Sequence, residues 1–169
     1  MSTTFDVENT PLHIAAHKTN NSTSIRSLIR QGADLEATNK AGWTPLHIAV
    51  AENSYGKAKA LLEAGANVNA TIDRQEDDTA LHLTAWTNNA KMARLLIAHG
   101  ARLDMYGEMG TPLETANHFR AYRVASVIQK EIHKREQAYL TQIENRHALR
   151  RIVAYKRCFK HYAPVRTRV

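Results

Sequence analysis

The sequence predicts an all-α solenoid of about four helix-turn-helix units, with β-hairpin-like loops between them and a C-terminal helix. Two observations predict this fold. A short motif recurs with starts 34, 35 and 32 residues apart, and a Gly-Ala pair follows each of its first three copies by 21 or 22 residues. Two motifs that stay in phase indicate a repeated structural unit. Because one such unit cannot bury its apolar face alone, the units must stack.

The short motif predicts the first helix of each unit. Its copies occupy residues 10–16, 44–50, 79–85 and, in decayed form, 111–116. The motif opens with Thr, which caps a helix by accepting from a free backbone N–H, and in three copies Pro follows, whose missing N–H is no loss there. In the first copy, Leu12, Ala15 and Ala16 form a small apolar face that a second helix can approach closely.

The second helix of each unit is expected over residues 25–30, 58–64 and 92–99, where branched aliphatic pairs occur. Gly32, Gly65 and Gly100 then lie where a helix needs a left-handed stop. These positions define the expected units, which span residues 9–40, 43–75, 78–107 and 110–132. The predicted organisation is therefore a repeat domain over residues 1–132 and a tail over residues 133–169.

The chain reads helical from Val124 onward, since neither Gly nor Pro occurs again before Pro164. We expect the start of this helix to cover the core of the last unit. The seam that would do so consists of Val124, Val127, Ile128 and Ile132.

The two repeated motifs resemble the ankyrin repeat family, whose unit is about 33 residues long with a T-P-L-H-x-A signature. The resemblance covers roughly residues 6–132 and is closest over 44–70 and 79–104. It implies that the protein recognises a partner protein and is not an enzyme, with no cofactor and no metal. It also implies that three histidines hydrogen-bond across neighbouring units, namely His13, His47 and His82.

The resemblance further implies which side chains line the concave groove of the stack. They lie just before each motif and seven or eight residues after its Thr. The groove set is Lys40, Trp43, Glu52, Gln75, Glu76, Asp78, Trp86, Glu108, Met109, His118 and Phe119. It includes both tryptophans of the chain, and Trp is enriched at interface hot spots. The alternative is that each indole packs on its neighbouring hairpin and only stiffens the stack.

Two loops suggest additional roles. Residues 73–78 carry four acids and one base, which would attract a basic partner or the basic tail; the alternative is a solvated loop. Asn69 looks like the loop asparagine that an asparaginyl hydroxylase modifies in ankyrin proteins of animal cells. The alternative, which we favour, is a turn residue whose side chain bonds its own backbone.

The residues give no sign of catalysis. The sequence contains no recognisable nucleophile–base pair, Gly-rich phosphate loop or metal-ligand spacing. The 37 residues outside the repeats are too few for a catalytic domain. The single cysteine, Cys158, and the absence of a classical signal peptide favour the cytoplasm. We expect a monomer when the protein is free.

The source and partner of the protein are open. Short ankyrin proteins with a charged tail are similar to effectors that intracellular bacteria deliver into host cells. Under that analogy the protein acts in the host cytosol on a host protein. A eukaryotic regulatory subunit is equally compatible with the residues.

The tail carries the basic excess of the chain. Residues 1–129 hold 12 Lys and Arg against 13 Asp and Glu, whereas residues 130–169 hold 11 against 3. Four basic residues of the tail fall within a helical arc of about 80°, namely Arg146, Arg150, Arg157 and Lys160. Three interpretations stay open: a solvated or docked capping helix, a helix that binds an anionic membrane or a calmodulin-like protein, and a helix that contacts nucleic acid. The second functional hypothesis is thus an adaptor held on an anionic membrane or nucleic acid by its tail.

Overall fold

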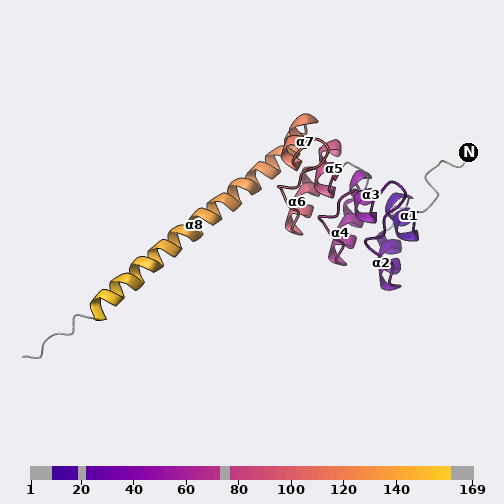
Figure 1. The fold of residues 1–169 in the computed structure, drawn as a ribbon. Helices are drawn as coiled ribbons and strands as arrows, with labels where there is room; N and C mark the ends of the chain where they lie inside the picture. Colours follow the sequence, from indigo (N-terminus) through magenta and orange to yellow (C-terminus); the bar gives the residue numbers. More distant parts are fainter. Residues whose placement is uncertain (1–8, 19–21, 73–76, 161–169) are drawn as a thin grey trace, which may run out of the picture. The chain divides into compact units, whose positions relative to one another are not determined.

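A computed structural model of the chain describes residues 9–18, 22–72 and 77–160, with 18, 22–23 and 151–160 as backbone only. Four short helices lie side by side in one layer, and three others pack on them as a second layer (Figure 1). The first layer, which we call the inner layer, consists of α1 (Pro11–Lys18), α3 (Pro45–Ala51), α5 (Ala80–Thr87) and α7 (Pro112–His118). The second layer consists of α2 (Ser22–Arg30), α4 (Tyr55–Glu63) and α6 (Ala90–Ala98). The predicted all-α solenoid is confirmed.

The Thr of the short motif is the N-cap of α3, α5 and α7, which begin at the next residue. The Oγ1 atom of Thr44 accepts from the His47 N–H at 3.4 Å, and the His47 Nδ1 atom accepts from the Thr44 N–H at 3.1 Å. This is a capping box in which histidine replaces the usual Glu or Gln. In the fourth unit Glu114 takes the place of the histidine, and its Oε2 atom accepts from the Thr111 N–H at 2.7 Å.

The second-layer helices end where the Gly-Ala pairs predict. Gly65 has a φ of +97°, in the left-handed region, and Gly32 and Gly100 adopt the same conformation. The N–H of the next residue, Ala66, donates to the Leu61 carbonyl at 3.0 Å and closes the last turn. These helices begin two or three residues before their predicted starts.

A buried histidine joins each of the first three units to the next. Because Nδ1 accepts from the backbone N–H of the capping Thr, Nε2 carries the proton and donates. Its acceptor is always a carbonyl at the base of the next hairpin: Trp43 for His13 at 2.8 Å, Ala70 for His47 at 3.0 Å, and Gly110 for His82 at 3.1 Å. The expected cross-unit hydrogen bonds are confirmed.

The connecting loops are hairpin-like but too short to form strands in the described part of the chain. Thr71 pairs with Thr79 and Gly107 with Gly110, each as an isolated antiparallel bridge. None of the helices in the described ranges combines the length and apolar character needed to cross a membrane.

The fourth unit is completed by the first turns of α8 (Tyr122–Lys160). Val124 and Ile128 are fully buried, as the seam predicts, whereas Val127 and Ile132 are only partly buried. The compact repeat unit ends at Gln129, and residues Lys130–Val169 form a second unit. The helix continues through this boundary because no Gly or Pro interrupts it.

Candidate functional site: an aromatic row on the inner layer

Three aromatic side chains from successive units pack against one another beside the inner helices. We call Trp43, Trp86 and Phe119 the aromatic row. The ring centroids of Trp43 and Trp86 lie 6.5 Å apart with a tilt of 42°, and those of Trp86 and Phe119 lie 6.3 Å apart, edge to face. Both distances fall in the range in which aromatic pairs attract. The row is therefore one continuous feature of the second, third and fourth units.

Hydrogen bonds hold both the N–H and the carbonyl group of Trp43. Its N–H donates to the Asn39 Oδ1 atom at 3.0 Å, and its carbonyl accepts from the Asn39 N–H at 3.0 Å. The same carbonyl accepts the 2.8 Å bond from His13 in the first unit. The indole thus extends from a rigid anchor that two units share.

Trp86 and Phe119 come from the ends of inner helices. Trp86 lies in the last turn of α5, and Phe119 caps the C-terminus of α7, where its N–H donates to the Thr115 carbonyl at 3.1 Å. The His118 ring packs edge-on against Phe119 at 5.2 Å. The residue after Phe119, Arg120, is left-handed with a φ of +55°, and it turns the chain toward α8.

The row is open to solvent although its rings touch. Trp86 is 47% exposed and Phe119 45%, while Trp43 is half-buried. The ring contacts agree with the interpretation that the aromatic residues stiffen the stack. They do not bury the rings, however, and contiguous exposed aromatic surface is typical of interaction sites.

Most of the other predicted groove residues are also accessible. The exposed ones are Lys40, Glu52, Glu108, Met109 and His118. Gln75 and Glu76 lie outside the described residues, as does most of the acidic loop. In the tail, Arg146 and Arg150 are exposed on α8, whereas Arg157 and Lys160 belong to its backbone-only part.

The prediction for Asp78 was wrong, because this side chain is buried and does not line a groove. It is 3% exposed, and its Oδ1 atom accepts from the Glu108 N–H at 3.2 Å. Gly107 lies so close that a Cβ atom there would overlap the carboxylate. Burial raises the pKa of Asp78, and the nearby His82 opposes this. Asp78 therefore holds the hairpin of the next unit in place.

Sequence reasoning missed the buried lysine between the first two units. Lys57 is 5% exposed, and its Nζ atom donates to the Ala16 carbonyl in α1 at 2.9 Å. Burial lowers the pKa of Lys57, while the charge of Glu52 acts in the opposite direction. The only sequence signal was its position beside the core residue Ala58 in α4.

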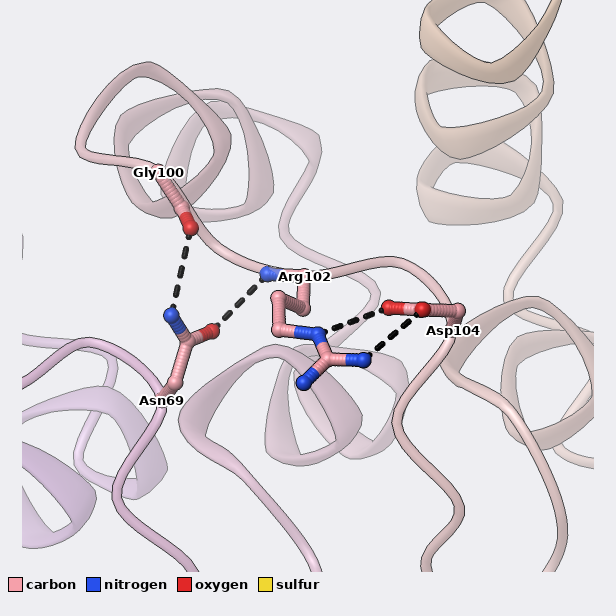
Figure 2. Close-up of polar contacts among 4 residues, drawn as sticks. All are labelled: Asn69, Gly100, Arg102 and Asp104. Carbon is pink, nitrogen blue, oxygen red and sulfur yellow. Dashed lines mark hydrogen bonds and ion pairs between the residues drawn. The ribbon is translucent and has the colours of Figure 1, made fainter.

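Asn69 also differs from its expected role, because its side chain bonds the neighbouring unit (Figure 2). Its Nδ2 atom donates to the Gly100 carbonyl at 3.2 Å, and its Oδ1 atom accepts from the Arg102 N–H at 2.8 Å. Asn67 makes the local turn bond instead, by accepting from the Asn69 N–H at 3.0 Å. The Arg102 guanidinium pairs with Asp104 at 2.9 Å on the same loop (Figure 2). The Asn69 side chain therefore ties two hairpins together.

The three buried histidines are neutral and fully hydrogen-bonded. Burial lowers the pKa of His47 to about 4 and lowers those of His13 and His82, which keeps the rings neutral near pH 7. Both nitrogens of each ring are already engaged in hydrogen bonds. Within the described ranges, no group of three or more His, Cys, Asp or Glu side chains could hold a metal ion.

Two ankyrin repeat models match the sequence, one describing three copies over residues 2–72 and the other many copies over residues 49–97. The chain belongs to the ankyrin repeat family. Ankyrin repeats are protein–protein interaction modules, and the family is typically non-catalytic.

Several curated proteins share the ankyrin sequence pattern. The putative E3 ubiquitin-protein ligases XBAT35 and XBAT34 of Arabidopsis thaliana are 38% and 37% identical, over 66% and 67% of this chain. The putative ankyrin repeat protein FPV031 of fowlpox virus is 34% identical over 76% of this chain. The matches cover only 25%, 31% and 41% of these relatives' own lengths.

Proposed function

We propose that this ankyrin protein binds a partner protein through the aromatic row and uses the exposed rings as anchors. The observation that carries the proposal is the continuity of three touching rings, two of them nearly half exposed, across three units. Large aromatic side chains supply much of the binding energy of protein interfaces. Because the backbone beneath Trp43 is hydrogen-bonded on both sides, little conformational entropy is lost when a partner docks.

The ring spacing favours an extended partner segment. Neighbouring centroids lie 6.5 and 6.3 Å apart. Alternate residues of an extended strand lie about 6.7 Å apart and point to the same side. A partner segment that follows the row in extended conformation would place every second side chain against a ring.

Partner binding at high salt tests the proposal. Proteins from eukaryotic cytosol would be captured on the wild-type chain at low salt and at about 0.5 M salt, where surface electrostatics is largely screened. The captured partner would then be purified, and its Kd measured for each variant. We expect Trp86→Ala/Phe119→Ala to raise the Kd by at least about 30-fold, since two hot-spot residues are lost.

The matched control is Tyr106→Ala/Tyr122→Ala, which removes two aromatic side chains that are 72% and 70% exposed but lie outside the row. This control should bind as the wild type does. Equal binding by the row variant, or a partner that washes off at high salt, would contradict the proposal. The melting temperature of each variant shows whether the fold has been kept.

A further inference from the structure

We propose that two copies of this protein pair through one face of α8 over residues 132–150, with the two helices antiparallel. The proposal replaces the expected monomer by a dimer, and it does not depend on the aromatic row. On this face, which we call the α8 seam, six residues follow one another at intervals of four, three, four, three and four. They are Ile132, Glu136, Tyr139, Ile143, Arg146 and Arg150. This alternation is the heptad spacing of a coiled coil.

The apolar members of the α8 seam are accessible to a second helix. Among the described residues of the second unit, α8 is the sole element. Tyr139 is 64% exposed, and Ile132 and Ile143 are partly exposed. A helix without tertiary packing is only marginally stable in water, because the packing of one face supplies most of its stability. A second copy of α8 would bury these three side chains and supply that packing.

The charged members of the seam select the antiparallel orientation. When Tyr139 lies opposite the partner's Ile143, symmetry places Glu136 opposite the partner's Arg146. Opposite charges then meet on both sides of the apolar centre. In a parallel pair each residue would face its own copy, so that two glutamates and two sets of arginines would repel. Polar residues at seam positions thus determine the orientation and the register.

Glu136 and Arg146 are not matched within their own helix. No Lys or Arg lies three or four positions from Glu136, and no Asp or Glu lies three or four positions from Arg146. The two exposed residues are about 15 Å apart along the helix axis, too far to reach each other. By contrast, Arg135 pairs with Glu131 at 3.0 Å. An antiparallel second copy supplies the missing partner to both.

The charge around the apolar centre favours a protein partner over an anionic membrane. Residues 130–144 hold three basic and three acidic side chains, whereas a helix that binds an anionic surface carries basic flanks. The basic excess comes later, with eight Lys or Arg and no acid in residues 145–169. Antiparallel pairing places these two basic segments at opposite ends of the seam, where salt screens their repulsion.

Sedimentation equilibrium of the full chain tests the pairing between about 1 and 100 μM. We expect the mass of a dimer at high concentration and dissociation on dilution. Ile143→Asp should raise the dimer Kd at least about 100-fold, since symmetry places two charges in the apolar centre. The matched control, Thr141→Asp, adds the same charge on the opposite side of the helix and should change the Kd by less than about twofold.

Exchange of the two charges tests the orientation. Glu136→Arg or Arg146→Glu alone brings like charges together in the antiparallel pair and should raise the Kd at least about tenfold. Glu136→Arg/Arg146→Glu restores both contacts and should return the Kd to within about threefold of the wild type. In a parallel pair, like charges would face each other in all of these proteins, and the double exchange would restore nothing.

Four results would overturn the proposal. They are a monomer at every concentration, equal effects of Ile143→Asp and Thr141→Asp, single exchanges that leave the Kd unchanged, and a double exchange that pairs no better than the single ones. A chain that stays monomeric but binds phosphatidylserine vesicles through Ile143 would assign the seam to a membrane instead. The row variant Trp86→Ala/Phe119→Ala should dimerise as the wild type does, so failure of this proposal is distinguishable from failure of the proposed protein interaction.

Discussion

The histidines that join neighbouring units make both of their hydrogen bonds only when the ring is neutral. In His47, Nδ1 must accept from the Thr44 N–H while Nε2 donates to the Ala70 carbonyl. A protonated ring would turn Nδ1 into a second donor that faces another donor. Burial lowers the pKa of His47 to about 4 from the usual 6.5, which protects the acceptor. The link between the second and third units is thus coupled to pH.

We expect acid to destabilise the repeat domain through His47. Between pH 6.5 and about 4 the unfolded chain binds a proton at this residue and the folded chain does not, so the free energy of unfolding falls as pH falls. The loss reaches about 3 kcal/mol at the lower end of this window, since each pH unit corresponds to about 1.4 kcal/mol. Below about pH 4 both states are protonated and the contribution of His47 stops changing.

Urea unfolding followed by tryptophan fluorescence checks this dependence. His47→Gln lacks the titrating ring, and its free energy of unfolding should vary less with pH than that of the wild type between about pH 7 and pH 4.5. Carboxylates contribute equally to both proteins and cancel in the comparison. Parallel pH profiles would exclude His47 as the source of acid sensitivity.

We expect replacement by Ala to have opposite effects on the free energy of unfolding at Gly107 and at Gly56. Gly107→Ala places a Cβ atom against the Asp78 carboxylate and 3.1 Å from the His82 Nε2 atom, and should lower the free energy of unfolding by about 1–3 kcal/mol. Gly56 lies in α4 with nothing within 4 Å, so Gly56→Ala should raise it by up to about 1 kcal/mol. Urea midpoints measure both changes, and a shared sign would contradict this account of Gly107.

At the scale of elements, the fourth unit is assembled from α7 and the beginning of α8. In α8, Val124, Ala125 and Ile128 are buried, whereas the exposed residues beyond Gln129 belong to the second unit. One continuous helix therefore has two roles. Its first turns fill a core, and the remainder presents side chains to solvent.

Two substitutions on α8 separate these roles. Ile128→Ala should lower the free energy of unfolding of the repeats by about 2–5 kcal/mol, because it leaves a cavity at a fully buried position. Leu149, which is 62% exposed, should tolerate the same replacement within about 0.5 kcal/mol. Tryptophan fluorescence reports on the repeats, which contain both Trp residues. Equal effects at the two positions would contradict the division of the helix.

The elements that could be predicted from the sequence are those that local chemistry determines. Capping Thr, left-handed Gly and the apolar seam at Val124 and Ile128 depend mainly on neighbouring residues. Asp78 and Trp43 both precede a motif Thr, yet one is buried and the other reaches the aromatic row. The two side chains differ in burial because the next hairpin approaches Asp78 more closely than Trp43. The sequence of a single unit does not specify that approach. The same holds for Lys57 and Asn69, whose partners lie 41 and 31 or 33 residues away.

At the scale of the whole molecule, aromatic surface and positive charge occupy different units. The repeats carry the aromatic row and balanced charge, and the tail carries the basic excess. Contacts through the aromatic rings persist when salt rises, whereas contacts through the basic tail weaken steeply.

Because Glu114 stands where the first three units have histidine, the fourth unit cannot donate the same hydrogen bond to a following unit. Each His donates a hydrogen bond to a carbonyl of the hairpin that follows it, but an ionised carboxylate can only accept one. A fifth unit grafted after the fourth would meet an acceptor where its own carbonyl needs a donor. Engineered extension of this protein should therefore succeed more readily by duplicating an internal unit than by appending one, unless Glu114 is restored to histidine at the same time.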